Sequence, residues 1–293
     1  MAGIETNTKF SLHIRSNSLP TTSHPLVLQF EEHLQRLKGS EATPSSSTLS
    51  HKFDELKDLH DCIDKLFQLP MEQQALAQEC NAKQVSDLLE GSLRLLDISS
   101  KAKDWIMQSK ESMQELQSNI RRKRGDESVF AAAAAKYLIS RKMIKKAVRN
   151  ASENLKGLKN DITCSSSKDN NNTSPIVFLL KEADAVTLSS LQNLLSFISD
   201  PKGHSKWSRW TSVSKFMQPK RVASDSQESN RNEFEKVDAA LQSLINGKPL
   251  SAENFQSYME NLEMCIQDLE IGFEQLSRKL IRNRVSLLNI FNH

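Results

Sequence analysis

Residues 81–124 read NAKQVSDLLEGSLRLLDISSKAKDWIMQSKESMQELQSNIRRKR, without proline and with Gly91 as the only glycine. This stretch has the a/d pattern of a helix that packs along its whole length against other helices, and it would be roughly 65 Å long. Leu89, Leu96 and Trp105 widen the apolar stripe, so we expect two neighbouring helices. The seven-residue spacing runs along two rows: Val85, Ser92, Ser99, Ile106, Met113 and Ile120, and Leu88, Leu95, Ala102, Ser109 and Leu116.

Glycine costs about 1 kcal/mol relative to alanine inside a helix. Gly91 in the middle of this helix therefore indicates a tight helix crossing. The serines and the alanine of the two rows should likewise let a partner backbone approach closely.

The composition favours an all-helical chain. Only eight glycines and eight prolines occur among 293 residues, and the prolines lie at segment edges. The net charge of +3 is too small to indicate a nucleic-acid binder by itself. Cys62, Cys80, Cys164 and Cys265 show no CxxC spacing and are expected to be free thiols in a reducing compartment. No apolar run reaches the ~18 residues needed to cross a bilayer.

Further helices follow from apolar spacing and from the turn residues between the segments. We expect them at 25–38, at about 47–67, at 71–79, from after Asp126 to about Lys159, from Pro175 to about Asp200, around Phe234–Leu244, and from Ser251 to the C-terminus. The last helix repeats the seven-residue spacing in two rows: Phe255, Leu262, Leu269 and Leu276, and Met259, Ile266, Phe273, Leu280 and Leu287. The fold class is therefore all-α, an elongated antiparallel helical bundle with long heptad-patterned helices.

The domain assignment is a disordered N-terminal arm at 1–24 and a single bundle at 25–292. A linker at 161–174 and a basic loop at 201–230 interrupt the bundle. The arm is polar and rich in serine and threonine, so a transit peptide is an alternative reading of it.

No catalytic motif stands out. The sequence has no phosphate loop, no GxGxxG, no HExxH and no GxSxG. His60, Asp61 and Cys62 are adjacent, but consecutive helical residues point in different directions, so we interpret them as a polar helix face. We expect neither a cofactor nor a metal, and no enzyme activity.

Two basic regions have alternative interpretations. Lys142, Lys145, Lys146 and Arg149 share one helical face, which is either a solvated surface or a docking site for anionic lipid or an acidic partner. Residues 202–221 combine six Lys/Arg with Trp207 and Trp210. Their helical spacing favours a short amphipathic turn over a nucleic-acid site, and no nucleic-acid partner is expected. The cations at 121–124 suit a helix C-terminus, with a nuclear address as the alternative.

The sharpest local motif is RSNSLP at 15–20, which has the form R-S-x-S-x-P. It looks like the phosphoserine motif that 14-3-3 proteins bind. Phosphorylation of Ser18 would add nearly two negative charges for the partner's arginine cluster. Arg15 would serve the kinase, and Pro20 would let the peptide turn out of the groove.

Several stretches resemble one plant family. They are FSLHIRSNSLP at 10–20 followed by SHPL at 23–26, then LP at 69–70 with QQAL at 73–76, GSLRLLD at 91–97, ELQS at 115–118 and the terminal helix at Leu269–Glu270. In these the chain is similar to plant proteins of unknown function related to the BYPASS proteins, and the acid-free Trp207 loop departs from the family's usual form. The resemblance implies a part in root and shoot development and in restraining a mobile root-derived signal. No catalytic residues are known for the family, so it supplies none.

Together these observations predict a non-enzymatic, cytoplasmic scaffold in plant developmental signalling, with a phospho-regulated arm. Plastid and nucleus are alternative compartments. The alternatives in function are a binder or enzyme that controls a mobile metabolite in a cavity between helices, and a peripheral membrane adaptor. A buried polar pocket with perturbed acids or histidines would favour the metabolite binder, and a dry continuous seam would favour the scaffold.

Overall fold

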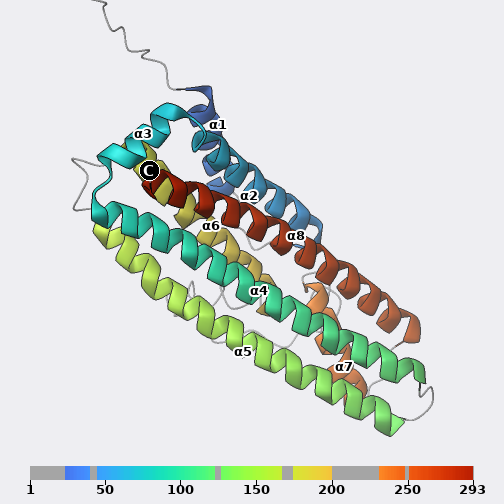
Figure 1. Ribbon diagram of the computed structural model, residues 1–293. Coiled ribbons are helices and arrows are strands. Elements are labelled where there is room, and N and C mark those ends of the chain that lie inside the picture. Colours follow the sequence, from blue (N-terminus) through green and yellow to red (C-terminus); the bar gives the residue numbers. More distant parts are fainter. Residues whose placement is uncertain are drawn as a thin grey trace, which may run out of the picture.

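The computed structural model describes residues 24–39, 45–122, 127–166, 174–199, 231–247 and 251–292. These residues form an elongated helical bundle and contain no strand (Figure 1). The helices are α1 (Pro25–Gly39), α2 (Ser46–Leu66), α3 (Pro70–Glu79), α4 (Ala82–Arg122), α5 (Glu127–Ser166), α6 (Pro175–Ser199), α7 (Glu233–Ile245) and α8 (Ala252–Asn292). The all-α bundle predicted from the sequence is confirmed.

The predicted helix ends agree with the structure to within about two residues, except at the end of α5. This helix continues to Ser166, so residues 161–166, expected in the linker, are helical. The expectation was wrong because serine and asparagine weaken a helix without ending it, and no proline occurs before Pro175. The rest of the linker, 167–173, lies outside the described residues.

The heptad rows of α4 form the predicted seam. Ile106, Met113 and Leu116 are buried, and α8 runs antiparallel to α4 beside them (Figure 1). The small residues bring the two backbones close, since Ser99 Oγ and Ser277 Oγ lie 2.8 Å apart. α4 packs against α5 and α6 as well as α8, which makes three neighbours where the sequence predicted two.

The most enclosed helix is α6. More than half of its 25 residues are buried, and it contacts α1, α2, α3, α4 and α5. A helix that is apolar on most of its surface must lie inside the protein, because exposing any face would be costly. α6 therefore lies inside the bundle, enclosed by α1 to α5.

Candidate functional site

The predicted docking motif and the predicted basic loop fall outside the described residues. Arg15, Ser18 and Pro20 belong to 1–23, and Trp207 and Trp210 belong to 200–230. Their roles stay predictions. The predicted basic face lies on α5, where the structure describes it.

Three of the four cations of this face are exposed. Lys142, Lys146 and Arg149 point outward, opposite the buried Tyr137 and Ile144. Lys145 differs, because its Nζ donates to Asp238 Oδ2 of α7 at 2.7 Å. The basic face is thus narrower than predicted, and Lys145 joins α5 to α7.

Arg141, which the sequence did not single out, is almost fully buried beside that pair. Its Nη2 donates to the Ile198 carbonyl at 3.0 Å, its Nε lies 3.4 Å from Asp238 Oδ1, and its guanidinium lies 4.3 Å from the Phe234 ring centroid. The carboxylate and the aromatic face compensate the buried charge. A guanidinium enclosed in this way ties α5, α6 and α7 together and is not available to a ligand.

The second polar cluster surrounds His60 of α2, which is buried. The Asn283 side chain of α8 donates from Nδ2 to His60 Nδ1 at 3.0 Å and to the His60 carbonyl at 3.1 Å. With Nδ1 accepting, Nε2 carries the proton and donates to Thr187 Oγ1 of α6 at 3.1 Å. Burial lowers the pKa of His60 to about 4, and the charge of Asp61 opposes this shift only in part.

The interpretation of His60, Asp61 and Cys62 as a polar helix face was therefore wrong for two of the three residues. His60 and Cys62 are buried, and only Asp61 forms a surface ion pair, with Lys279. The reason is that α1, α6 and α8 all pack on α2 and leave it little outer surface.

Asp184 of α6 lies where α4 crosses that helix. A Cβ on Gly91 would lie 2.4 Å from Asp184 Oδ2, so the glycine permits this approach, as a tight crossing requires. Desolvation by the surrounding residues raises the pKa of Asp184 to about 7, and Arg94 opposes the shift. The Asp184 carboxyl thus carries its proton for much of the time at neutral pH.

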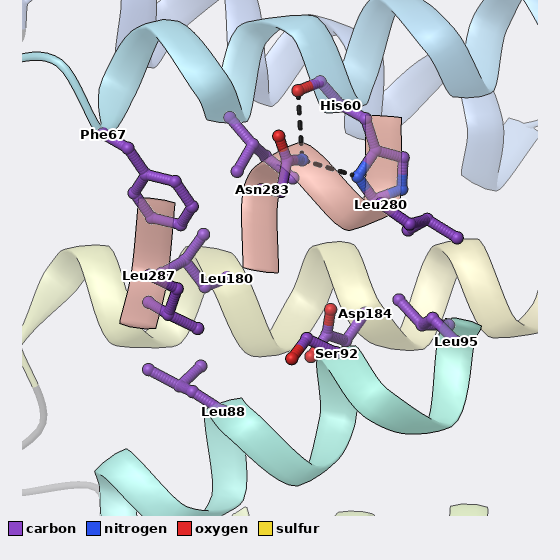
Figure 2. A pocket seen from close by; sticks show the side chains of 11 residues that line it. His60, Phe67, Leu88, Ser92, Leu95, Leu180, Asp184, Leu280, Asn283 and Leu287 are labelled. Atoms are coloured by element: carbon purple, nitrogen blue, oxygen red, sulfur yellow. Dashed lines mark hydrogen bonds between the residues drawn. The ribbon is translucent and has the colours of Figure 1, made fainter. Parts of the chain in front are cut away.

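A cavity lies between these groups. Figure 2 shows the Asp184 carboxyl and Ser92 away from His60 and Asn283, with leucines and Phe67 around them. Its volume is about 30 Å³, room for one or two water molecules. The Asn283 Oδ1 atom in its wall has no hydrogen-bond partner among the described residues. The cavity lining is His60, Ile63, Phe67, Leu88, Ser92, Leu95, Leu180, Asp184, Leu280, Asn283 and Leu287.

This arrangement offers a buried neutral imidazole and a partly buried carboxyl that titrates near neutrality, in a cavity lined mostly by apolar side chains. Among the described residues, no three His, Cys, Asp or Glu side chains converge as metal ligands would. In the same part of the chain, no helix has both the length and the hydropathy of a transmembrane segment.

Comparison with known proteins identifies a family. The model of the family described as Protein BPS1 matches residues 52–290. No curated protein and no solved structure matches the chain. The matched range contains the LP, GSLRLLD and ELQS stretches and most of the terminal helix, and begins after the opening signature at 10–26. The resemblance to the BYPASS-related proteins is thereby confirmed, and the chain belongs to the BPS1 family.

Proposed function

We propose that the chain is a non-enzymatic scaffold that acts in the cytoplasm during plant root and shoot development. Membership of the BPS1 family suggests a role in plant development. The scaffold role is supported by the bundle itself. Its helices bury their inner faces on one another in a single hydrophobic core, and their outer faces carry side chains that could contact partners.

The observation that carries the proposal is the outer face of α5. Ile139 and Met143 are more than half exposed there, among the exposed cations Lys142, Lys146 and Arg149. Exposed large apolar side chains with charges around them are typical of contact surfaces. An acidic protein surface with an apolar centre has the chemistry that fits this face.

The N-terminal arm provides the proposed regulation. Phosphorylated Ser18, with Arg15 and Pro20, would dock the arm on a 14-3-3 protein. The test is fluorescence anisotropy with purified 14-3-3 protein and a peptide of residues 10–24 phosphorylated at Ser18. The unphosphorylated peptide is the matched control. Saturable binding of the phosphopeptide alone is expected, and its absence at high micromolar concentration would remove the arm from the proposal.

The scaffold role is tested by affinity purification of the full chain from plant tissue. Wild type is compared with Ser18→Ala and with Ile139→Glu/Met143→Glu, a change confined to exposed positions. Each variant should lose its own subset of partners while the fold, followed by circular dichroism, is retained. Recovery of the same partners with all three chains would contradict the proposal.

The cavity favours the rival proposal of a metabolite binder or enzyme by its chemistry, because it holds a histidine and an acid with shifted pKa values. Its size argues against that rival. Pockets for small molecules measure about 300–1,000 Å³, and this cavity measures about 30 Å³. A plant metabolite that raises the melting temperature of wild type but not of Asp184→Asn would support the rival.

The third candidate, a peripheral membrane adaptor, shares the α5 face with the main proposal. Cations beside exposed Ile139 and Met143 also suit the boundary between lipid headgroups and acyl chains. Flotation with anionic vesicles distinguishes binding to lipid from binding to an acidic protein.

A further inference from the structure

α8 has a second stripe on the side away from the core, in which five of eight residues are apolar. The stripe consists of Met264, Gln267, Ile271, Glu274, Arg278, Ile281, Val285 and Leu288, all at least partly exposed. Its members alternate at spacings of three and four residues, the pattern of a helix that pairs with another helix. Met264, Ile271, Ile281 and Val285 are between 47% and 58% exposed. The stripe lies roughly opposite the buried row that contains Leu262, Leu269 and Leu276.

The described helices leave this stripe uncovered. In Figure 1, α8 runs between α2 and α4, and its remaining side faces outward. Glu270 pairs with Lys110 of α4 on one flank, and Lys279 pairs with Asp61 of α2 on the other. The stripe lies between these flanking ion pairs, so a partner helix could rest on it without breaking either of them. Within the stripe, Glu274 pairs with Lys103 of α4 and with Arg278 of its own helix, so a partner helix would share these charges.

The charges of α8 are divided along its length. Every acidic residue of the helix lies between Glu253 and Glu274, and every basic residue lies between Arg278 and Arg284. This division makes the helix complementary to a second α8 that runs in the opposite direction, because its basic stretch then faces an acidic one.

We propose that the outer stripe is a dimer interface occupied by α8 of a second copy of this chain, packed antiparallel about a two-fold axis. In the register that places Ile271 opposite Ile281 of the second copy, Met264 meets Leu288, and Gln267 meets Val285. Glu274 then faces Arg278 of the second copy twice, once on each side of the axis. Both copies thus use the same surface of α8, and this surface is complementary to itself, as an isologous interface requires.

The same register places Glu270, which also pairs with Lys110, opposite Arg282 of the second copy at the edge of the stripe. The paired stretch covers 24 residue steps, roughly 36 Å of helix.

The test is the mass of the full chain in solution, measured by light scattering or sedimentation at 10–100 μM. Wild type should have about 66 kDa, twice the 33.1 kDa of one chain. Glu274→Arg alone places arginine opposite Arg278, and Arg278→Glu alone places glutamate opposite Glu274. Each should weaken dimerisation by at least roughly tenfold. An equimolar mixture of the two variants restores both opposite-charge pairs and should regain the dimer.

Arg149→Glu on α5 is the matched control, an exposed charge reversal that should leave the dimer intact. Thermal melts followed by circular dichroism verify that each variant folds. The register is checked with Ile271→Cys and Ile281→Cys. A disulfide should form between the two variants when mixed and within neither alone.

A monomeric wild type at 100 μM would overturn the proposal. So would a dimer that both charge variants retain, since another surface would then hold it. A dimer lost in both variants and not regained on mixing would also contradict the antiparallel register. The inference does not depend on the proposed scaffold function, because purified protein alone decides it.

Discussion

The crossing of α2 and α8 gives the sharpest test of the packing. Gly272 of α8 lies against the buried ring of Phe53, and a Cβ at this position would lie 2.3–2.5 Å from three ring atoms. The ring has little freedom to retreat, because it packs edge-on against Phe273 with ring centroids 5.0 Å apart. Gly272→Ala should therefore destabilise the protein even though alanine is the better helix former.

The magnitude follows from two opposing effects. Alanine gains about 1 kcal/mol of helix propensity over glycine. Ordinary contact begins near 3.4 Å, so the ring or the helix must move by about 1 Å, and overpacking of this kind costs typically 1–3 kcal/mol and occasionally more. We expect a net loss of about 1–2 kcal/mol, or a fall in melting temperature of roughly 2–8 °C if each kcal/mol lowers it by ~2–4 °C.

The assay is urea unfolding followed by circular dichroism, with Gly39→Ala as the matched control. A Cβ on Gly39 would meet nothing within 4 Å, so alanine there should be neutral or stabilising. Adding Phe53→Leu to Gly272→Ala should recover part of the loss, and the double-mutant cycle should give a coupling of about 1 kcal/mol. If Gly272→Ala and Gly39→Ala have the same free energy of unfolding, α2 and α8 do not approach each other as closely as described here.

Three further predictions concern the polar groups. Arg141→Met should lower the free energy of unfolding by about 2–4 kcal/mol, because Asp238 and the Ile198 carbonyl lose a buried partner. Lys142→Met, an exposed neighbour, should change it by less than about 0.5 kcal/mol in the same denaturation assay. Asp184 has a pKa of about 7 when folded and an ordinary value of 3.8, so its cost to stability grows as pH rises from about 4 to 7. Asp184→Asn should accordingly gain stability over wild type above pH 7, by up to about 4 kcal/mol, and the gain should vanish near pH 4. The cost of buried His60 runs the other way and grows as pH falls from 6.5 toward 4, so only the difference between wild type and variant isolates Asp184. In flotation with vesicles containing phosphatidylserine, Lys142→Glu/Lys146→Glu/Arg149→Glu should behave like wild type if α5 binds acidic proteins, whereas loss of flotation in this variant alone would support the membrane adaptor.

The sequence predicted the elements and the seam because both depend on local periodicity. Ile106 and Leu116 recur at the spacing of a buried helix face, and both are buried. The role of Gly91 at a helix crossing could also be predicted. Glycine destabilises the interior of a helix, so it is expected there mainly where another helix approaches closely. These residues act through short-range spacing, which one chain displays without knowledge of its fold.

The polar sites could not be predicted in the same way, because each is assembled from helices far apart in the sequence. His60 looked exposed on one helix, yet Thr187 and Asn283 enclose it from two others. Lys145 lies on the same helical face as Lys142 by sequence spacing, but its ammonium group donates to Asp238 of α7. The many apolar residues at 175–199 could have indicated that this helix is enclosed by others. The burial of Arg141 beside Ile198 could then have been predicted as well.

Seven-residue rows decide that helices pack but leave their register open, because a slip of one heptad again places apolar residues on apolar residues. In this bundle polar contacts fix the register. His60, Thr187 and Asn283 meet at one level of α2, α6 and α8, and Arg141, the Ile198 carbonyl and Asp238 meet at one level of α5, α6 and α7. A slipped register would strand an imidazole or a guanidinium in hydrocarbon, which costs several kcal/mol. α6 takes part in both clusters, so one enclosed helix sets the level of four others. The polar residues of the core therefore select one arrangement among several that hydrophobic packing alone would accept.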